Sequence, residues 1–243
     1  VVALSVCLHC FRLFLNIVCV HLLPGRSTEC WQYHQINKQI NKWEQAIGLT
    51  EATLPGKRSL PGYFRLTTQS IPGFPHGSAV LFIRKEIPHV QLDTSQLCTT
   101  SAEFVGARMS IGNRTFAILL GYVRPNGTEL PSEEILAWCK DRSEELLICG
   151  DFNAHNVAWG SARTDKRGDA LMTVIEQMGL AVANDGRPTF FRPPNSYSVL
   201  DVTAHKPSRK TKSVTDLDTP FQFFKCPCPD QLFTAIFEGT ILY

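Results

Sequence analysis

Short apolar runs bounded by turn residues recur along the chain and predict a protein built mainly on β-strands. Most of the runs are too short for a helix, and the longer ones alternate apolar with polar positions. The turn at Gly112-Asn113 separates two such runs and therefore predicts a β-hairpin. The predicted strands are residues 46–49, 78–84, 104–111, 115–123, 146–149, 180–183, 189–192 and 198–203.

Helical spacing of apolar residues occurs in three places. The first stretch has apolar residues at Tyr33, Ile36, Ile40, Trp43 and Ile47, and we expect its helix to end near Trp43 because a strand starts at residue 46. The second runs from residue 132 to 141, with Ser132 as the predicted N-cap. The third starts at about residue 169 and ends at residue 179, a glycine.

The order of these elements predicts the fold class. Strands that look antiparallel alternate with a few helices, which favours an α/β fold: a four-layer sandwich of two mixed β-sheets flanked by helices, as in DNase I-like proteins. The order does not favour a doubly wound parallel sheet, and no Gly-rich phosphate loop of either standard type is present. Because the sequence starts on Val, we expect a fragment whose fold is incomplete at both ends.

Composition adds little to this picture. The chain has 243 residues, 44% of them hydrophobic, which is enough for one globular domain. Its formal net charge of +2 argues for neither nucleic acid nor membrane, so a nucleic-acid function must rest on a site. Nine scattered cysteines, several of them within apolar runs, predict reduced, buried thiols and no zinc site.

The first 23 residues are apolar but include polar interruptions such as Arg12 and Asn16. A membrane span is disfavoured, because a central Arg costs roughly 2.5–3.5 kcal/mol in insertion scales. A signal peptide, a buried first strand and sequence added by gene misprediction all stay open. We therefore predict three regions: an uncertain apolar segment at 1–30, a catalytic-type domain at 31–208 and a divergent tail at 209–243.

Polar side chains stand at or next to the ends of several predicted strands. They are Glu51, Tyr122, Asp151 with Asn153, and Asp201. Strands of one sheet can bring such residues to a single rim, where loops form a cleft. Carboxylates with an amide and a phenol suit oxygen ligation of Mg²⁺, with Mn²⁺ as an alternative, and activation of a water. These residues predict metal-assisted phosphoester hydrolysis.

The order of the motifs is more specific. Between about residues 46 and 205 the chain resembles the endonuclease/exonuclease/phosphatase superfamily, and within it the apurinic-type endonuclease domain of non-LTR (LINE-like) retrotransposons. The segments that carry the resemblance are AIGLTEATL (46–54), LPGY (60–63), GSAVLFIR (77–84), GYVRP (121–125), CGDFNAH (149–155), WG (159–160), RG (167–168), NDG (184–186) and SVLDVT (198–203).

The resemblance implies a role for each residue. Glu51 would be the metal ligand, and Asp151 would position and deprotonate the attacking water. Asn153 would fix that carboxylate or a phosphate oxygen, Tyr122 would hydrogen-bond to the phosphate, and Asp201 would orient a catalytic His. The partner would be double-stranded DNA, nicked to give a 3′-hydroxyl that primes a reverse transcriptase domain of the parent polyprotein. Such a protein would act in the nucleus or the cytoplasm, and not at a membrane.

The chain departs from the family at its closing Ser-Asp-His motif. No His follows residue 208, Asp216 lies too close to Asp201 to replace the missing Asp, and His205 is a poor substitute on a predicted strand. Asn16 is a poor counterpart of the family's first-strand Asn. We therefore expect reduced or no activity. Two alternatives stay open: a phosphatase or phosphodiesterase of the same superfamily, and a catalytically dead DNA-binding remnant.

Several nearby residues have simpler explanations. His155 and Trp159 are expected to pack and to anchor loops. Arg163, Lys166 and Arg167 form a short cationic run that could contact DNA phosphates, although such runs are usually solvated.

Overall fold

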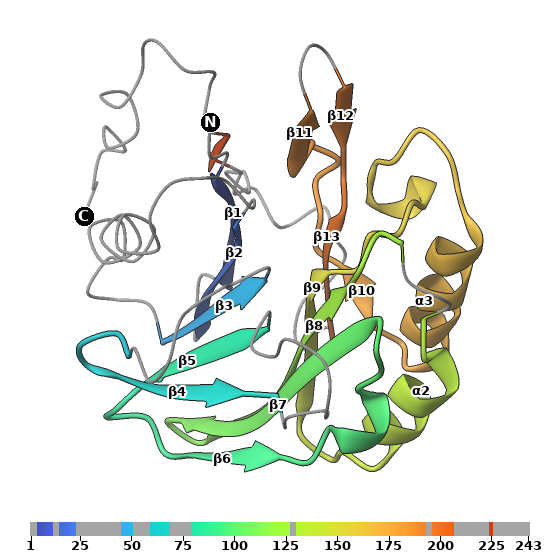
Figure 1. Cartoon of the computed structure of the whole chain (residues 1–243). Helices are drawn as coiled ribbons and strands as arrows, with labels where there is room; N and C mark the ends of the chain where they lie inside the picture. The colour runs from blue at the N-terminus through green and yellow to red at the C-terminus, as the bar shows by residue number, and fades with distance from the viewer. Residues whose placement is uncertain are drawn as a thin grey trace, which may run out of the picture.

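The computed structural model describes residues 4–11, 15–22, 45–50, 59–68, 79–126, 130–192, 196–206 and 224–225. The helix predicted to end near Trp43, the predicted metal ligand Glu51 and most of the tail at 209–243 lie outside these residues. Two six-stranded sheets face each other, and two helices cover the outer face of the second sheet (Figure 1).

The first sheet has the strand order β14-β1-β2-β3-β5-β4. It is mixed, because β2 runs parallel to β3 while all other neighbours are antiparallel. The strands are β1 (Leu4–Phe11), β2 (Leu15–Leu22), β3 (Ala46–Thr50), β4 (Tyr63–Thr67), β5 (Val80–Arg84) and β14 (Phe224–Lys225).

The second sheet has the order β10-β13-β9-β8-β7-β6 and is also mixed, with β8 parallel to β9. Its members are β6 (His89–Leu92), β7 (Ala102–Ile111), β8 (Arg114–Val123), β9 (Glu145–Asp151), β10 (Ala181–Val182) and β13 (Asp201–His205). A separate hairpin of β11 (Phe190–Arg192) and β12 (Ser196–Ser198) precedes β13. The predicted strand at 198–203 is therefore two strands, interrupted at residues 199–200.

Two apolar layers hold the sheets and helices together. Between the sheets, side chains of β3 and β5 such as Ala46 and Leu81 meet alternate residues of β7, β8 and β9 such as Val105 and Leu120. The opposite residues of the second sheet pack against the helices. Because strand side chains alternate, each residue of β7–β9 is committed to one layer or the other. The predicted class of two mixed sheets with helices outside is confirmed.

The N-terminal ends of both described helices differ from the prediction. In α2 (Ser132–Lys140) the N-cap is Pro131, so Ser132 lies inside the helix and does not cap it. In α3 (Lys166–Gln177) the helix begins three residues before the predicted start. Asp165 is its N-cap, accepting a hydrogen bond from the backbone N–H of Gly168 at 2.7 Å. The missed signal was Asp165, a good capping residue that stands ahead of the apolar periodicity.

The apolar N-terminal segment forms β1 and β2, so the strand alternative for this segment agrees with the structure. None of the described helices is long and apolar enough to cross a membrane. Three described cysteines, Cys98, Cys139 and Cys149, are free thiols; Cys139 and Cys149 are buried and Cys98 is half-buried. Burial raises the pKa of Cys139 to about 12.

Candidate active site

Four polar side chains form one row across four neighbouring strands of the second sheet. Glu103 on β7 pairs with Tyr122 on β8, Tyr122 pairs with Asp151 on β9, and Asp151 pairs with Asp201 on β13. Paired residues carry their side chains on the same face, with Cα atoms about 5 Å apart. All four are buried and lie on the face toward the first sheet, because they alternate in step with the core residues of that layer.

The sequence predicted three of these four residues, and the register brings those three together. Asp151 and Asp201 are 1% and 5% exposed, so both carboxyl groups are buried. Tyr122 is also a core aromatic at 6% exposure. A buried carboxylate is costly unless it binds a proton, a cation or several donors, so two of them face to face indicate a functional site.

The turn after β9 holds Asp151 in place. The backbone N–H of Asn153 donates to Oδ1 of Asp151 at 2.9 Å, and the Asn153 side-chain amide donates to the Val123 carbonyl at 2.9 Å. Asn153 has a φ of +45°, a left-handed conformation that Asn tolerates better than most residues. Arg167 donates to the Asn153 carbonyl at 2.9 Å. The Asp-x-Asn motif is thus an Asx-type turn anchored to two neighbouring elements.

Asp201 is held through its backbone. The Thr189 hydroxyl accepts hydrogen bonds from the N–H groups of Leu200 and Asp201, at 3.0 and 3.1 Å. Asn184 donates to the Asp201 carbonyl at 2.8 Å and accepts from the Thr203 N–H at 2.9 Å. Asn184 belongs to the Asn-Asp-Gly motif, so this motif fixes the start of β13.

Two glycines allow the close approaches that the site needs. A Cβ on Gly150, whose φ is +140°, would lie 1.9 Å from the Gly121 carbonyl oxygen on the neighbouring strand. A Cβ on Gly160 would lie 2.3 Å from the Cα of Gly186, so the Trp-Gly and Asn-Asp-Gly motifs touch. Trp159 itself is fully buried and its indole N–H donates to Ala154, in agreement with the anchoring role expected from the sequence.

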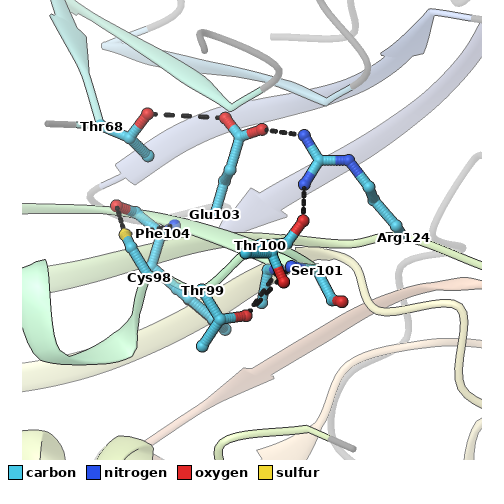
Figure 2. Close-up of polar contacts among 9 residues, drawn as sticks. Thr68, Cys98, Thr99, Thr100, Ser101, Glu103, Phe104 and Arg124 are labelled. Carbon is cyan, nitrogen blue, oxygen red and sulfur yellow. Dashed lines mark hydrogen bonds and ion pairs between the residues drawn. The ribbon is translucent and has the colours of Figure 1, made fainter. Parts of the chain in front are cut away.

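Glu103 is part of a network at the other end of the row (Figure 2). Its Oε1 forms an ion pair with Nη2 of Arg124 at 2.7 Å, and its Oε2 accepts from the Thr68 hydroxyl at 3.5 Å. Arg124 also donates from Nη1 to the Thr100 carbonyl at 2.7 Å. Its guanidinium carbon lies 5.9 Å from the centre of the Tyr122 ring. The network therefore reaches the aromatic member of the row.

A cleft of about 710 Å³ opens beside Asn153. Its lining includes the cationic side chains of Arg163, Lys166 and Arg167, against the single carboxylate of Asp165. That carboxylate accepts hydrogen bonds from the backbone N–H groups of Gly168 and His155, so it caps a helix. The cleft is consequently electropositive and adjoins the Asp-x-Asn turn.

Two His residues lie near these motifs, His155 after β9 and His205 at the end of β13. His155 lines the cleft. His205 pairs with Leu147 at the opposite end of β13 from Asp201, about 13 Å along the strand. Burial lowers the pKa of His205. Within the described residues, no group of three or more His, Cys, Asp or Glu side chains is arranged to hold a metal ion.

The sequence interpretation overlooked Glu103, Arg124 and Thr189. Glu103 stands before a run that looks like an ordinary strand, and only the register reveals that it shares a row with Tyr122 and Asp151. Arg124 was visible within the Gly-Tyr-Val-Arg-Pro segment but had no assigned task. The available hint for Glu103 was an acidic residue directly beside an apolar run.

The sequence model of the family described as "Endonuclease-reverse transcriptase" matches residues 116–222. No curated protein matches the chain in sequence. Among solved structures, the endonuclease domain of TRAS1, a telomere-specific non-LTR retrotransposon, is 20% identical with a TM-score of 0.59, over 79% of this chain and 85% of that chain.

Two further structures are similar at the level of the fold. Humanized TDP2 from D. rerio is 12% identical with a TM-score of 0.54, over 82% of this chain and 86% of that one. A mannosyl-6-phosphatase from Bacteroides thetaiotaomicron is 16% identical with a TM-score of 0.53, over 80% and 86%. Nucleases and phosphatases thus share the architecture.

The match to residues 116–222 covers the part of the chain that supplies Tyr122, Asp151 and Asp201. The chain has the fold of the endonuclease/exonuclease/phosphatase superfamily with a match to its endonuclease-reverse transcriptase family, which confirms the recognition made from the motifs.

Proposed function

We propose that this protein is a metal-dependent phosphodiesterase that nicks double-stranded DNA, the endonuclease domain of a non-LTR retrotransposon polyprotein with reduced activity. The observation that carries the proposal is the buried row in which the register pairs Tyr122, Asp151 and Asp201. These residues are far apart in sequence, and a structural role alone gives no reason for two carboxyl groups to be buried face to face.

In this proposal Asp151 positions the attacking water and takes its proton. General-base help of this kind is typically worth about 10²–10⁴-fold in rate. The Asn153 backbone N–H donates to one oxygen of that carboxylate and so fixes its orientation. Tyr122, in the neighbouring strand, donates a hydrogen bond to the scissile phosphate.

The donor set around the row is composed of oxygen ligands, which suits Mg²⁺ or Mn²⁺. Glu51 is the proposed metal ligand and directly follows β3, whose last residue Thr50 is buried and whose strand contacts β8 and β9. When bound, the ion would supply neutralisation of charge on the phosphate. Asp201 is the carboxylate proposed to orient a catalytic imidazole.

Three features support DNA as the substrate. The cleft beside Asn153 is lined by three cations, as expected for a surface that contacts phosphates. The matching family is described as an endonuclease-reverse transcriptase, and a similar fold occurs in the endonuclease of a retrotransposon. A reverse transcriptase domain in the same polyprotein is the corresponding partner, acting in the nucleus or the cytoplasm.

Reduced activity is proposed because the sequence lacks the Ser-Asp-His motif. Loss of that motif removes both an acid and the imidazole that stabilises the transition state. The catalytic domain is proposed to span residues 31–208, preceded by the apolar segment at 1–30 and followed by the divergent tail.

Relaxation of supercoiled plasmid tests the proposal. We expect slow nicking that requires Mg²⁺ and that falls below detection in Asp151→Asn, because the base is lost while the shape is kept. The matched control is Glu176→Gln, which replaces an exposed carboxylate on α3 and should leave the rate unchanged. Equal nicking by Asp151→Asn and the unaltered chain would contradict the assigned role.

Assays of the same protein distinguish the two alternative functions, a phosphatase and a catalytically dead DNA-binding remnant. Hydrolysis of a phosphate monoester with no nicking would favour a phosphatase, a class with which the chain shares the fold. DNA binding without hydrolysis of either substrate, with or without Mg²⁺, would favour a catalytically dead remnant.

A further inference from the structure

The ion pair between Glu103 and Arg124 is not explained by the roles given so far. Glu103 has a side chain only 3% exposed, whereas that of Arg124 is 26% exposed, so the arginine is the member that faces the surface. Burying a carboxylate solely for a structural ion pair contributes little, because the cost of removing two charges from water offsets most of their attraction. This difference in exposure indicates that the buried Glu103 carboxylate serves to orient the more exposed arginine.

The geometry of Arg124 points toward the row. Arg124 is two residues after Tyr122, and its backbone N–H continues the ladder to the Ser101 carbonyl at 2.8 Å, so its side chain leaves on the same face. The guanidinium stands 5.9 Å from the Tyr122 ring centre. The next residue, Pro125, lines the electropositive cleft. Arg124 therefore lies beside the row, and its neighbour in the chain lines the cleft.

The guanidinium has capacity left for a ligand. It carries five N–H donors in a planar fork. One donates to Glu103 and one to the Thr100 carbonyl, and the remaining donors reach no other described residue. The two bonds fix the plane of the group, and a planar fork with further N–H groups matches the oxygens of a phosphate.

We propose that Arg124 binds a non-bridging phosphate oxygen of the substrate and that Glu103 is its positioning residue. This rests on the proposed function for the identity of the substrate, and it extends that function to a pair of residues that the motifs do not assign. Glu103 acts through Arg124: its carboxylate sets the direction of the fork, and the hydroxyl of Thr68, the residue after β4, donates to the other carboxylate oxygen.

Binding of a fluorescein-labelled 20-base-pair duplex to the full chain, followed by anisotropy in Mg²⁺ at several salt concentrations, tests the pair. Arg124→Gln should weaken binding about tenfold, as expected for a charged hydrogen bond, and reduce the salt slope by about 1. Arg124→Lys should restore the slope but only part of the affinity, because a point charge replaces the fork. Glu103→Gln alone should weaken binding. Added to Arg124→Gln, it should cause no further loss of affinity.

Arg108→Gln is the matched control. Arg108 also lies on this sheet and pairs with a glutamate, Glu144, but toward the other end of β7. It should leave affinity unchanged. The proposal is overturned if Arg124→Gln binds like this control. The positioning role is overturned if Glu103→Gln weakens binding equally with and without Arg124, or changes only the melting temperature.

A second experiment uses inorganic phosphate as the probe and measures the melting temperature. If the unaltered chain binds no duplex, yet phosphate raises its melting temperature and Arg124→Gln abolishes that rise, then the DNA function fails and the Arg124 phosphate site stands. If neither probe binds, both are overturned. Binding of the duplex without nicking removes only hydrolysis, and the Arg124 comparison is still decided by affinity.

Discussion

At the scale of single residues, the site depends on side chains that never touch a substrate. Thr189 is 6% exposed, and its hydroxyl satisfies two backbone N–H groups at the start of β13. Asn184 satisfies a carbonyl and an N–H of the same strand. These two residues fix the register of Asp201 against Asp151, which no local propensity could achieve.

Replacing Thr189 by Val tests this support. The variant keeps the volume but removes the acceptor, so two N–H groups lose their partner. We expect the free energy of unfolding to fall by about 1–3 kcal/mol, with a parallel loss of nicking, measured by urea denaturation and plasmid relaxation.

Thr173→Val is the matched control. Its hydroxyl donates to the Asp169 carbonyl on an exposed helix surface, so the change should stay within about 0.5 kcal/mol. Equal losses in the two variants would show that the Thr189 hydrogen bonds contribute nothing specific.

At the scale of elements, β8 and β9 carry the row, and their contact is unusually close. Gly121 and Gly150 are register partners, and the Gly150 backbone has a positive φ. The sequence interpretation placed a strand here and ended it at residue 149, whereas β9 continues through Asp151. Two more paired residues bring the carboxylate into the sheet itself, which fixes its direction more firmly than a loop would.

Gly150→Ala should therefore be severely destabilising. The added Cβ would lie 1.9 Å from the Gly121 oxygen, and a backbone atom cannot move aside without separating the strands. Gly179→Ala is the comparison, because its φ is +62° but a Cβ there meets no atom within 4 Å.

The comparison variant should lose about 1–2 kcal/mol from backbone strain alone. Gly150→Ala should lose clearly more or fail to fold, as followed by circular dichroism and thermal melting. Equal melting temperatures for the two variants would contradict the close contact between β8 and β9.

At the scale of the whole molecule, cationic side chains cluster locally although the net charge is small. The net charge of +2 gives no hint of a nucleic-acid partner, yet three cations gather at the cleft next to the Asp-x-Asn turn. Arg163 and Lys166 form no ion pair or hydrogen bond with the described residues, so both are available to phosphates.

Charge removal at the cleft should therefore change how DNA binding depends on salt. We expect the double substitution Arg163→Gln with Lys166→Gln to lower the slope of log affinity against log salt by about 2. Lys140→Gln, an exposed cation at the end of α2, should leave the slope unchanged. An unaltered slope in the double variant would remove the cleft from the DNA-binding surface.

Alternation of apolar and polar residues, with turn dipeptides between the runs, was enough to place most strands of the second sheet, the hairpin and the fold class, whereas β4 and β6 were not predicted. These features are local, and the motif order that identified the superfamily is also readable along one dimension. Element ends were less accurate: Ser132 was mistaken for a cap, and Asp165, the true cap of α3, was not noticed. Glu51 lies outside the described residues, so its role stays a prediction.

Only the tertiary structure decided which polar residues share a site. Asp151 and Asp201 are fifty positions apart, and their pairing follows from strand register, which depends on long-range packing and on hydrogen bonds such as those of Thr189. The same register put Glu103 beside Tyr122 and placed Arg124 over its ring. A pattern along the chain reports which residues are buried, but a shift by one residue would turn every one of these side chains to the other face.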